Sequence, residues 1–249
     1  MQTIAIVSAG GGAGRTMLTA TLAGLLAARG RKVLAIDLDP RNNLGLHLGL
    51  PLDEADGLAP QLLAGGSWHQ AAFQNSDGVR VLPFGVLAPE RLPLLEGALL
   101  KSPHWLGEQL AHLALDDDTV VLIDTPRLPS QYAQQAIAAA ELTLAVLCPD
   151  ASAPVTARQV EQHAAGHPVY HVLNQLDATR TLQRDVLQLL REQLGTRVAP
   201  YPIHRDQTVP EAVASNRSLT AYAPHGQAAH DCQGLANWLL ERLAARSPA

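Results

Sequence analysis

A run of glycines near the start of the chain, SAGGGAGRTM over residues 8–17, has the composition of a phosphate-binding loop. Glycines let backbone N–H groups approach phosphate oxygens, and a helix that follows directs its positive end at the same place. The common pattern G-x-x-x-x-G-K-[ST] places a lysine at the β- and γ-phosphates. Gly14 and Thr16 fit this pattern, whereas Ala9 replaces its first glycine and Arg15 its lysine. The residues expected to bind a nucleotide are Gly10, Gly11, Gly12, Ala13, Gly14, Arg15, Thr16 and Met17.

Carboxylates follow two other apolar runs. Asp37 and Asp39 end the run KVLAIDLDP over residues 32–40, and alternation along a strand sends both side chains the same way. Asp124 ends the run VVLID, which is where P-loop proteins carry an acid that helps to hold Mg²⁺. We therefore predict that Thr16, Asp37 and Asp124 bind Mg²⁺ and that Asp39 orients a water molecule. The alternatives are a solvated strand end for the first two acids and a ligand-free turn for the glycines.

Elements that could position these residues alternate along the chain. Apolar runs predict strands over 3–9, 32–40, 79–85, 119–126, 142–150, 168–177 and 197–206. Helices are expected over 16–29, 58–64, 68–73, 92–115 with a break near Pro103, between the fifth and sixth strands, and over 182–194, 209–214 and 225–245. The pattern indicates an α/β fold of P-loop NTPase type: a doubly wound, mainly parallel sheet with helices on both faces. Ligands of such sheets bind beyond the carboxyl ends of the strands.

Composition narrows the class of protein. The chain has 249 residues, 47% of them hydrophobic, and shows no repeat or linker, so we expect one domain over 1–249. The net charge of −5 disfavours a nucleic-acid partner. No charged leader or run of about 20 apolar residues is present, so we expect a cytoplasmic protein. Cys148 and Cys232 lie in apolar contexts and are expected to be inert core residues.

The order of the three clusters, GGxGRT, then DLDP, then an apolar run ending in DTP, resembles the MinD/ParA family of deviant Walker ATPases over nearly the whole chain. The resemblance implies that ATP and Mg²⁺ are the cofactors. It also implies a homodimer with the nucleotides at its interface. Asn174 matches the residue that reads adenine in that family. The closing segment is similar to the family's base pocket at Pro202, Ile203, His204 and Asp206.

Within this family the chain is most similar to the cellulose-biosynthesis group BcsQ (YhjQ). The shared stretches are LLAGGSWHQA, VLPFG, SPHW, IDTPR, IHRD and LANW, in this order. This resemblance implies a regulatory or scaffold component of a bacterial cellulose synthase secretion complex. Its partners would be a small companion protein and other cytoplasmic components of the synthase, with the membrane reached only through them. The C-terminal stretch LANWLLERLAAR is expected to pack on the core and not on lipid.

Departures from the family pattern concern charge. Gly10 stands where the family has its signature lysine, which reaches the partner's nucleotide, and Arg127 replaces a glycine of the switch segment. Arg15 keeps a positive charge in the loop, but arginine is bulkier than lysine. We therefore expect ATP binding with slow or absent hydrolysis, and Arg41 and Arg127 are the candidates to supply the missing cation. The alternatives are an active MinD/ParA-type positioning or partitioning ATPase and a nucleotide-free interaction module.

Overall fold

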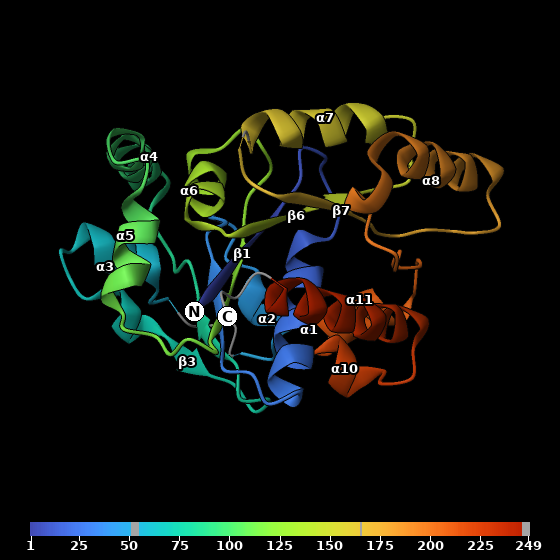
Figure 1. Cartoon of the computed structure of the whole chain (residues 1–249). Helices are drawn as coiled ribbons and strands as arrows, with labels where there is room; N and C mark the ends of the chain where they lie inside the picture. Colours follow the sequence, from blue (N-terminus) through green and yellow to red (C-terminus); the bar gives the residue numbers. More distant parts are fainter. Residues whose placement is uncertain (51–54, 165, 246–249) are drawn as a thin grey trace.

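A seven-stranded sheet forms the centre of the molecule, with strand order β3-β4-β2-β5-β1-β6-β7 (Figure 1). The computed structural model describes residues 1–50, 55–164 and 166–245. The strands are β1 (Gln2–Val7), β2 (Val33–Asp37), β3 (Phe73–Gln74), β4 (Arg80–Leu82), β5 (Val120–Asp124), β6 (Leu142–Leu147) and β7 (Val169–Leu173). All neighbouring strands pair in parallel except β3 and β4, which are antiparallel. The mainly parallel sheet confirms the predicted fold class.

Helices cover both faces of this sheet. They are α1 (Arg15–Ala28), α2 (Leu44–His47), α3 (Leu58–Leu63), α4 (Leu92–Lys101), α5 (Trp105–His112), α6 (Gln131–Ala139), α7 (Ala153–His163), α8 (Thr181–Leu194), α9 (Thr208–Ala214), α10 (Leu219–Tyr222) and α11 (Gln227–Ala244). Short 3-10 turns lie at Trp68–Ala71, Pro89–Arg91 and Gly195–Arg197. The core on one face includes residues of α1, α9, α10 and α11, and the core on the other includes residues of α3 to α7.

Strand β1 shows why these runs become central strands. Ile4 and Ile6 pack into the core beneath α1 and α11, whereas Ala5 and Val7 pack into the core beneath α5 and α6. All four side chains are fully buried. A strand buried on both faces needs apolar residues at every position and not only at alternate ones, which is the pattern seen in the sequence.

The structure changes two predictions of secondary structure and adds helices that are not predicted. No strand forms over 197–206; residues there make isolated bridges only, at Val198 and His204. Pro200 and Pro202 lack the N–H donors that a ladder needs. The helix predicted over 68–73 is a 3-10 turn followed by β3. Helices α2, α6 and α10 are absent from the predictions. The break near Pro103 is confirmed by the end of α4 and the start of α5.

The C-terminal helix α11 packs on the core, as expected from its apolar stripe. Leu235, Trp238, Leu239 and Leu243 are buried in the same cluster as residues of α1. Arg242 lies over the rings of Trp238 and Tyr170, 5.5 and 5.6 Å from their centres. In the described part of the chain, none of the helices has the length and apolar character needed to cross a bilayer.

Candidate nucleotide-binding site

The parallel register brings the glycine loop and two of the predicted acids to one edge of the sheet. The loop leaves the end of β1, and Asp37 and Asp124 end the neighbouring strands β2 and β5, where they are register partners. Gly12 and Gly14 have φ angles of 66° and 88°. This left-handed conformation is strained for residues with a side chain, so the loop requires glycine at both positions.

A pocket of about 900 Å³ opens beside this loop. It is lined by residues 12–17 of the loop and α1, 41, 43, 46 and 47 after β2, 174 and 175 after β7, and 204–207, 209, 210, 213 and 214. Most of the predicted nucleotide-binding residues therefore meet around one space. Gly10, Gly11, Pro202 and Ile203 do not line it, and the Ile203 side chain is fully buried in the core.

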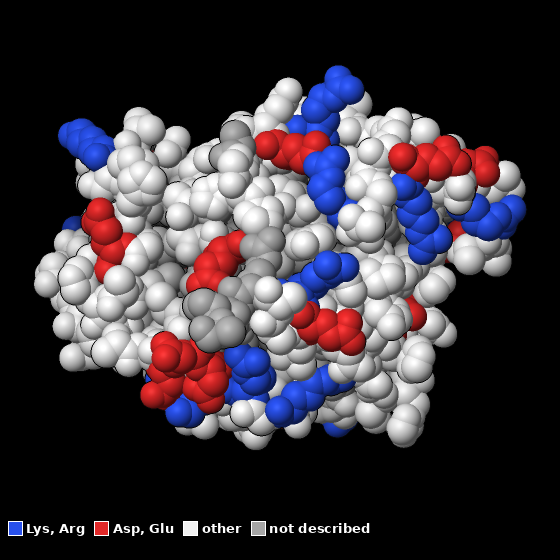
Figure 2. All heavy atoms as spheres, in the orientation of Figure 1, with Lys and Arg blue, Asp and Glu red and all other residues white. Residues whose placement is uncertain are grey.

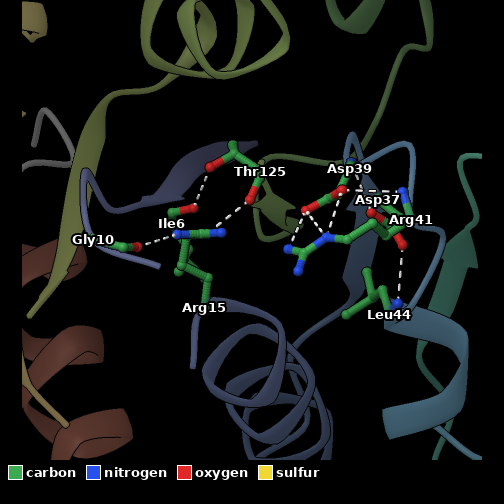
Figure 3. Close-up of polar contacts among 8 residues, drawn as sticks. All are labelled: Ile6, Gly10, Arg15, Asp37, Asp39, Arg41, Leu44 and Thr125. Carbon is green, nitrogen blue, oxygen red and sulfur yellow. Dashed lines mark hydrogen bonds and ion pairs between the residues drawn. The ribbon is translucent and has the colours of Figure 1, made fainter. Parts of the chain in front are cut away.

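Arg15 is bound to backbone carbonyl groups. Its Nε donates to the Thr125 carbonyl oxygen at 2.9 Å and its Nη1 to the Gly10 carbonyl oxygen at 3.1 Å (Figure 3). The residue is 5% exposed. Burial lowers the pKa of Arg15, and Asp124 and Asp39 raise it in part, but a guanidinium stays charged in proteins. Arg15 thus ties the start of the glycine loop to the segment that follows β5.

Asp37 stabilises the chain turn after β2. One carboxylate oxygen accepts the Asp39 N–H at 2.9 Å and the other accepts the Leu44 N–H, also at 2.9 Å. Burial, followed by the charge of Asp124, raises the pKa of Asp37 well above its ordinary value. The carboxyl is fully buried and does not line the pocket. The structure therefore gives Asp37 a backbone-capping position, and its role as a magnesium ligand stays a prediction.

Asp39 is held by Arg41. One oxygen accepts the Arg41 backbone N–H at 3.0 Å and its Nε at 3.1 Å, and the other accepts Nη2 at 2.6 Å. Asp39 is 3% exposed, whereas the Arg41 side chain is 61% exposed and lines the pocket. The carboxylate predicted to orient water is therefore engaged in an ion pair in this structure.

The Asp124 carboxyl is fully buried at the end of β5. Neither of its oxygens accepts a hydrogen bond of normal geometry from the described residues, although the Thr16 hydroxyl lies close enough to affect the carboxyl. Burial raises the pKa of Asp124 to about 7, against the lowering effect of Thr16 and Arg15. Buried polar atoms are normally satisfied by protein, water or an ion, so these two oxygens indicate a missing partner. No group of three or more His, Cys, Asp or Glu side chains in the described residues could hold a metal ion by itself.

Two residues at the end of β7 tie down the glycine loop. The Asn174 amide nitrogen donates to the Ala13 carbonyl oxygen at 2.7 Å, and the Gln175 amide nitrogen donates to the Gly12 carbonyl oxygen at 2.7 Å. A Cβ added at Gly14 would lie 2.2 Å from the Asn174 amide nitrogen. Gln175 is not among the predicted site residues, and no local sequence pattern marks it.

The segment before α9 is fixed by its own hydrogen bonds. Asp206 accepts the N–H groups of Thr208 and Ala228 at 2.9 and 3.0 Å, so it caps both α9 and α11. Burial opposes ionisation of Asp206, but these N–H groups prevail and lower its pKa. His204 Nδ1 lies 2.9 Å from an Asp231 carboxylate oxygen. Both residues line the pocket, but their observed contacts are with protein.

Arg127 and the short helix α2 complete the surroundings of the loop. Arg127 lies beside Gly11, where a Cβ would be 4.0 Å from its Nη1. Arg127 makes no hydrogen bond or ion pair with other residues in the described ranges. Leu46 and His47 of α2 form part of the pocket wall, and burial lowers the pKa of His47 to about 4. Helix α2 has four residues, so it is too short to show a helical repeat of apolar residues in the sequence.

Comparisons with known proteins give a family for the chain. A family model described as cellulose biosynthesis protein BcsQ matches residues 1–240. The cellulose biosynthesis protein BcsQ of Salmonella typhi is 31% identical over 231 residues, covering 92% of this chain and 90% of the relative. The chromosome-partitioning ATPase Soj of Thermus thermophilus is 29% identical over 258 residues, covering 98% and 97%.

A solved structure shares the fold. The septum site-determining protein MinD of Pyrococcus horikoshii, complexed with Mg-ADP, superimposes with a TM-score of 0.77 and 25% identity. The match covers 100% of this chain and 99% of the MinD chain. The resemblance to MinD and ParA proteins that the sequence motifs indicate is therefore confirmed.

Proposed function

Because the chain belongs to the BcsQ family of cellulose biosynthesis proteins, we propose that it is an ATP-binding regulatory or scaffold component of a bacterial cellulose secretion complex. One observation carries the ATP-binding part of this proposal. The 900 Å³ pocket is bounded by the glycine loop and the start of α1, where backbone N–H groups and the helix dipole favour phosphate. Val209, Pro210 and Val213 also line this pocket and offer apolar surface for a base.

Magnesium fits the same site. Among the residues that the structure describes, none donates a hydrogen bond of normal geometry to the two buried oxygens of Asp124, and the Thr16 hydroxyl is close to them. Mg²⁺ is usually bound by one or two protein oxygens together with phosphates and water, which suits a site that lacks a full protein cage. Bound there, the ion would neutralise phosphate charge. Thr16 and Asp124 are the residues best placed to hold it.

Calorimetry with purified protein tests nucleotide binding. We expect ATP to bind with a Kd in the micromolar range when Mg²⁺ is present, and more weakly when EDTA removes it. ADP is the matched ligand without the terminal phosphate. Absence of binding at millimolar ATP would support the nucleotide-free interaction module in place of this proposal.

We propose that hydrolysis is slow, since Gly10 cannot supply the family's cation and Arg41 holds Asp39. Gly10 has an ordinary φ, and a Cβ there would meet only Ser8 Oγ at 3.6 Å and Thr156 Cγ2 at 3.9 Å. A side chain is therefore tolerated at this position. Gly10→Lys combined with Arg15→Lys should raise steady-state phosphate release. Brisk release by the unaltered protein would favour the active positioning ATPase instead.

Dimerisation is the next part of the proposal. The segments 37–43 and 124–131 flank the glycine loop and would meet a second copy across the nucleotide. Light scattering with ATP, ADP and no nucleotide tests this. We expect a dimer with ATP; a monomer in all three conditions would contradict it.

The cellular role is proposed from family membership, with recruitment to the cytoplasmic face of the inner membrane through protein partners. On the face seen in Figure 2, basic and acidic side chains are interspersed and form no broad basic patch. This face therefore lacks the basic stripe that binds a phosphate backbone. Deleting the gene should reduce cellulose output and synthase assembly, and the wild-type gene should restore both.

The similarity to the chromosome-partitioning ATPase Soj favours one second candidate function, which is partitioning. Normal cellulose output in the deletion strain, together with plasmid or chromosome loss, would select this second function.

A further inference from the structure

The ion pair of Asp39 and Arg41 joins a buried carboxylate to a solvent-exposed guanidinium. Arg41 contacts both carboxylate oxygens through Nε at 3.1 Å, and its Nη2 lies 2.6 Å from one of them. Asp39 is 3% exposed and does not line the pocket, whereas Arg41 lines it and is 61% exposed in its side chain. The acid is thus shielded from a ligand in the pocket, but its cation is not.

Of the three arginines near the loop, Arg41 is the one that both lines the pocket and is paired with an anion. Arg15 is buried and donates to the carbonyl groups of Gly10 and Thr125. Arg127 lies beside Gly11 but does not line the pocket. Figure 3 shows Arg15 and Arg41 entering from opposite sides, with their guanidinium groups directed toward the same region above the start of α1. An arginine bound to a carboxylate can transfer to a phosphate, because a phosphate group also presents pairs of oxygens that a guanidinium can bind.

We propose that Arg41 exchanges Asp39 for the terminal phosphate of a bound nucleoside triphosphate, so that this residue distinguishes a triphosphate from a diphosphate. The proposal rests on the proposed nucleotide binding and extends it to one residue. A diphosphate leaves Arg41 on Asp39. A triphosphate draws Arg41 away and in the same step frees the Asp39 carboxylate. The triphosphate must therefore compete with an internal anion for this cation.

A double-mutant cycle measured by calorimetry with ATP and ADP tests the exchange. Arg41→Ala should weaken ATP binding by about tenfold or more, the usual effect of losing a charged hydrogen bond, and change ADP binding by no more than about twofold. Asp39→Asn keeps the shape of the side chain but removes the competing charge. It should strengthen ATP binding several-fold, because Arg41 no longer has to leave a charged partner to reach the phosphate. ADP binding should stay unchanged.

The double variant separates competition from simple repulsion. If Asp39 acts only by holding Arg41, Asp39→Asn has no effect on ATP affinity once Arg41 is alanine. A gain of equal size in both backgrounds would mean that Asp39 merely repels the phosphates, and it would overturn the proposal. Arg205→Ala is the matched control, because Arg205 is an exposed arginine of the same pocket without a contact to Asp39. This control should affect ATP and ADP equally.

Two further outcomes are decisive. Equal loss of ATP and ADP affinity in Arg41→Ala would overturn the exchange while leaving nucleotide binding intact. Failure of the unaltered protein to bind either nucleotide would overturn the proposed function and this inference together. Circular dichroism of each variant confirms that it is folded.

Discussion

Arg15 and Arg41, two arginines at the carboxyl edge of the sheet, are held by different kinds of acceptor. Arg15 donates to two neutral backbone carbonyl groups and is 5% exposed. Arg41 pairs with a carboxylate and is 61% exposed in its side chain. Both occupy positions next to the same pocket.

This difference separates a fixed cation from an exchangeable one. The carbonyl groups of Gly10 and Thr125 belong to the backbone of two segments, so losing Arg15 leaves two acceptors without donors and releases the segments from each other. Asp39 also accepts the Arg41 backbone N–H, which remains when the guanidinium leaves. Arg15 is therefore expected to maintain the shape of the loop, and Arg41 to respond to what the pocket contains.

The largest effect is expected from Arg15→Ala. It should lower the free energy of unfolding by about 1–3 kcal/mol, because buried acceptors lose their partners. It should also weaken ATP binding, since a cation leaves the loop. Urea unfolding with calorimetry measures both, and Arg41→Ala serves as the comparison, because it removes a cation without taking a donor from a backbone carbonyl group.

Arg15→Lys sharpens the test. A lysine keeps the charge but cannot donate to both carbonyl groups with the fixed geometry of a guanidinium. Stability should fall nearly as far as in Arg15→Ala, while ATP affinity falls less. Unchanged stability in both variants would show that the loop is held by its backbone alone.

Asp124→Asn is expected to change stability by a similar amount in the opposite direction. The pKa of Asp124 is raised from 3.8 to about 7, so the folded state binds more protons than the unfolded state between these pH values. The ligand-free protein therefore loses stability as the pH rises through this window, and the asparagine variant should lose less. At pH 8 without Mg²⁺ the variant should be more stable by about 1–3 kcal/mol, because a buried unpaired charge is removed.

Mg²⁺ provides the matching measurement for Asp124. If the carboxylate holds the ion, the gain in ATP affinity on adding Mg²⁺ should disappear in Asp124→Asn. An unchanged gain would mean that the ion is held by Thr16 and the phosphates without Asp124. If the stability of Asp124→Asn varied with pH as that of the wild-type protein does, the raised pKa of Asp124 would be contradicted.

How far the sequence predicts this molecule depends on the range of the interactions involved. The central strands follow from runs such as TIAIV, because a strand buried on both faces must be apolar throughout. The shared position of the loop, Asp37 and Asp124 follows in turn from parallel pairing. No element is predicted over 131–139, although the alanine-rich composition of α6 favours a helix.

Contacts of long side chains are less predictable. Nothing in the local sequence shows that Arg15 reaches the Thr125 carbonyl, 110 positions away, or that Asp206 caps α11 at Ala228. The segment 197–206 has apolar residues that are buried without forming a strand, since burial alone does not specify a ladder. The roles of polar residues in this site thus depend on tertiary contacts that the pattern does not contain.

The smallest predicted effects on stability concern the hydrogen bonds that Asn174 and Gln175 donate to the glycine loop. One of these bonds is buried and the other is exposed. Asn174 and Gln175 donate to neighbouring carbonyl groups at the same distance, 2.7 Å, but Asn174 is 2% exposed and the Gln175 contact is open to water. Water can replace the Gln175 amide at the Gly12 carbonyl, whereas the Ala13 carbonyl would lose a buried donor. Asn174→Ala should therefore lower the free energy of unfolding by about 1 kcal/mol or more, and Gln175→Ala should change it by less than about 0.5 kcal/mol. Urea titrations of both variants at one pH give the comparison. Equal losses would show that exposure does not govern how firmly β7 holds the loop, and the distinction drawn between Arg15 and Arg41 would then need a cause other than burial.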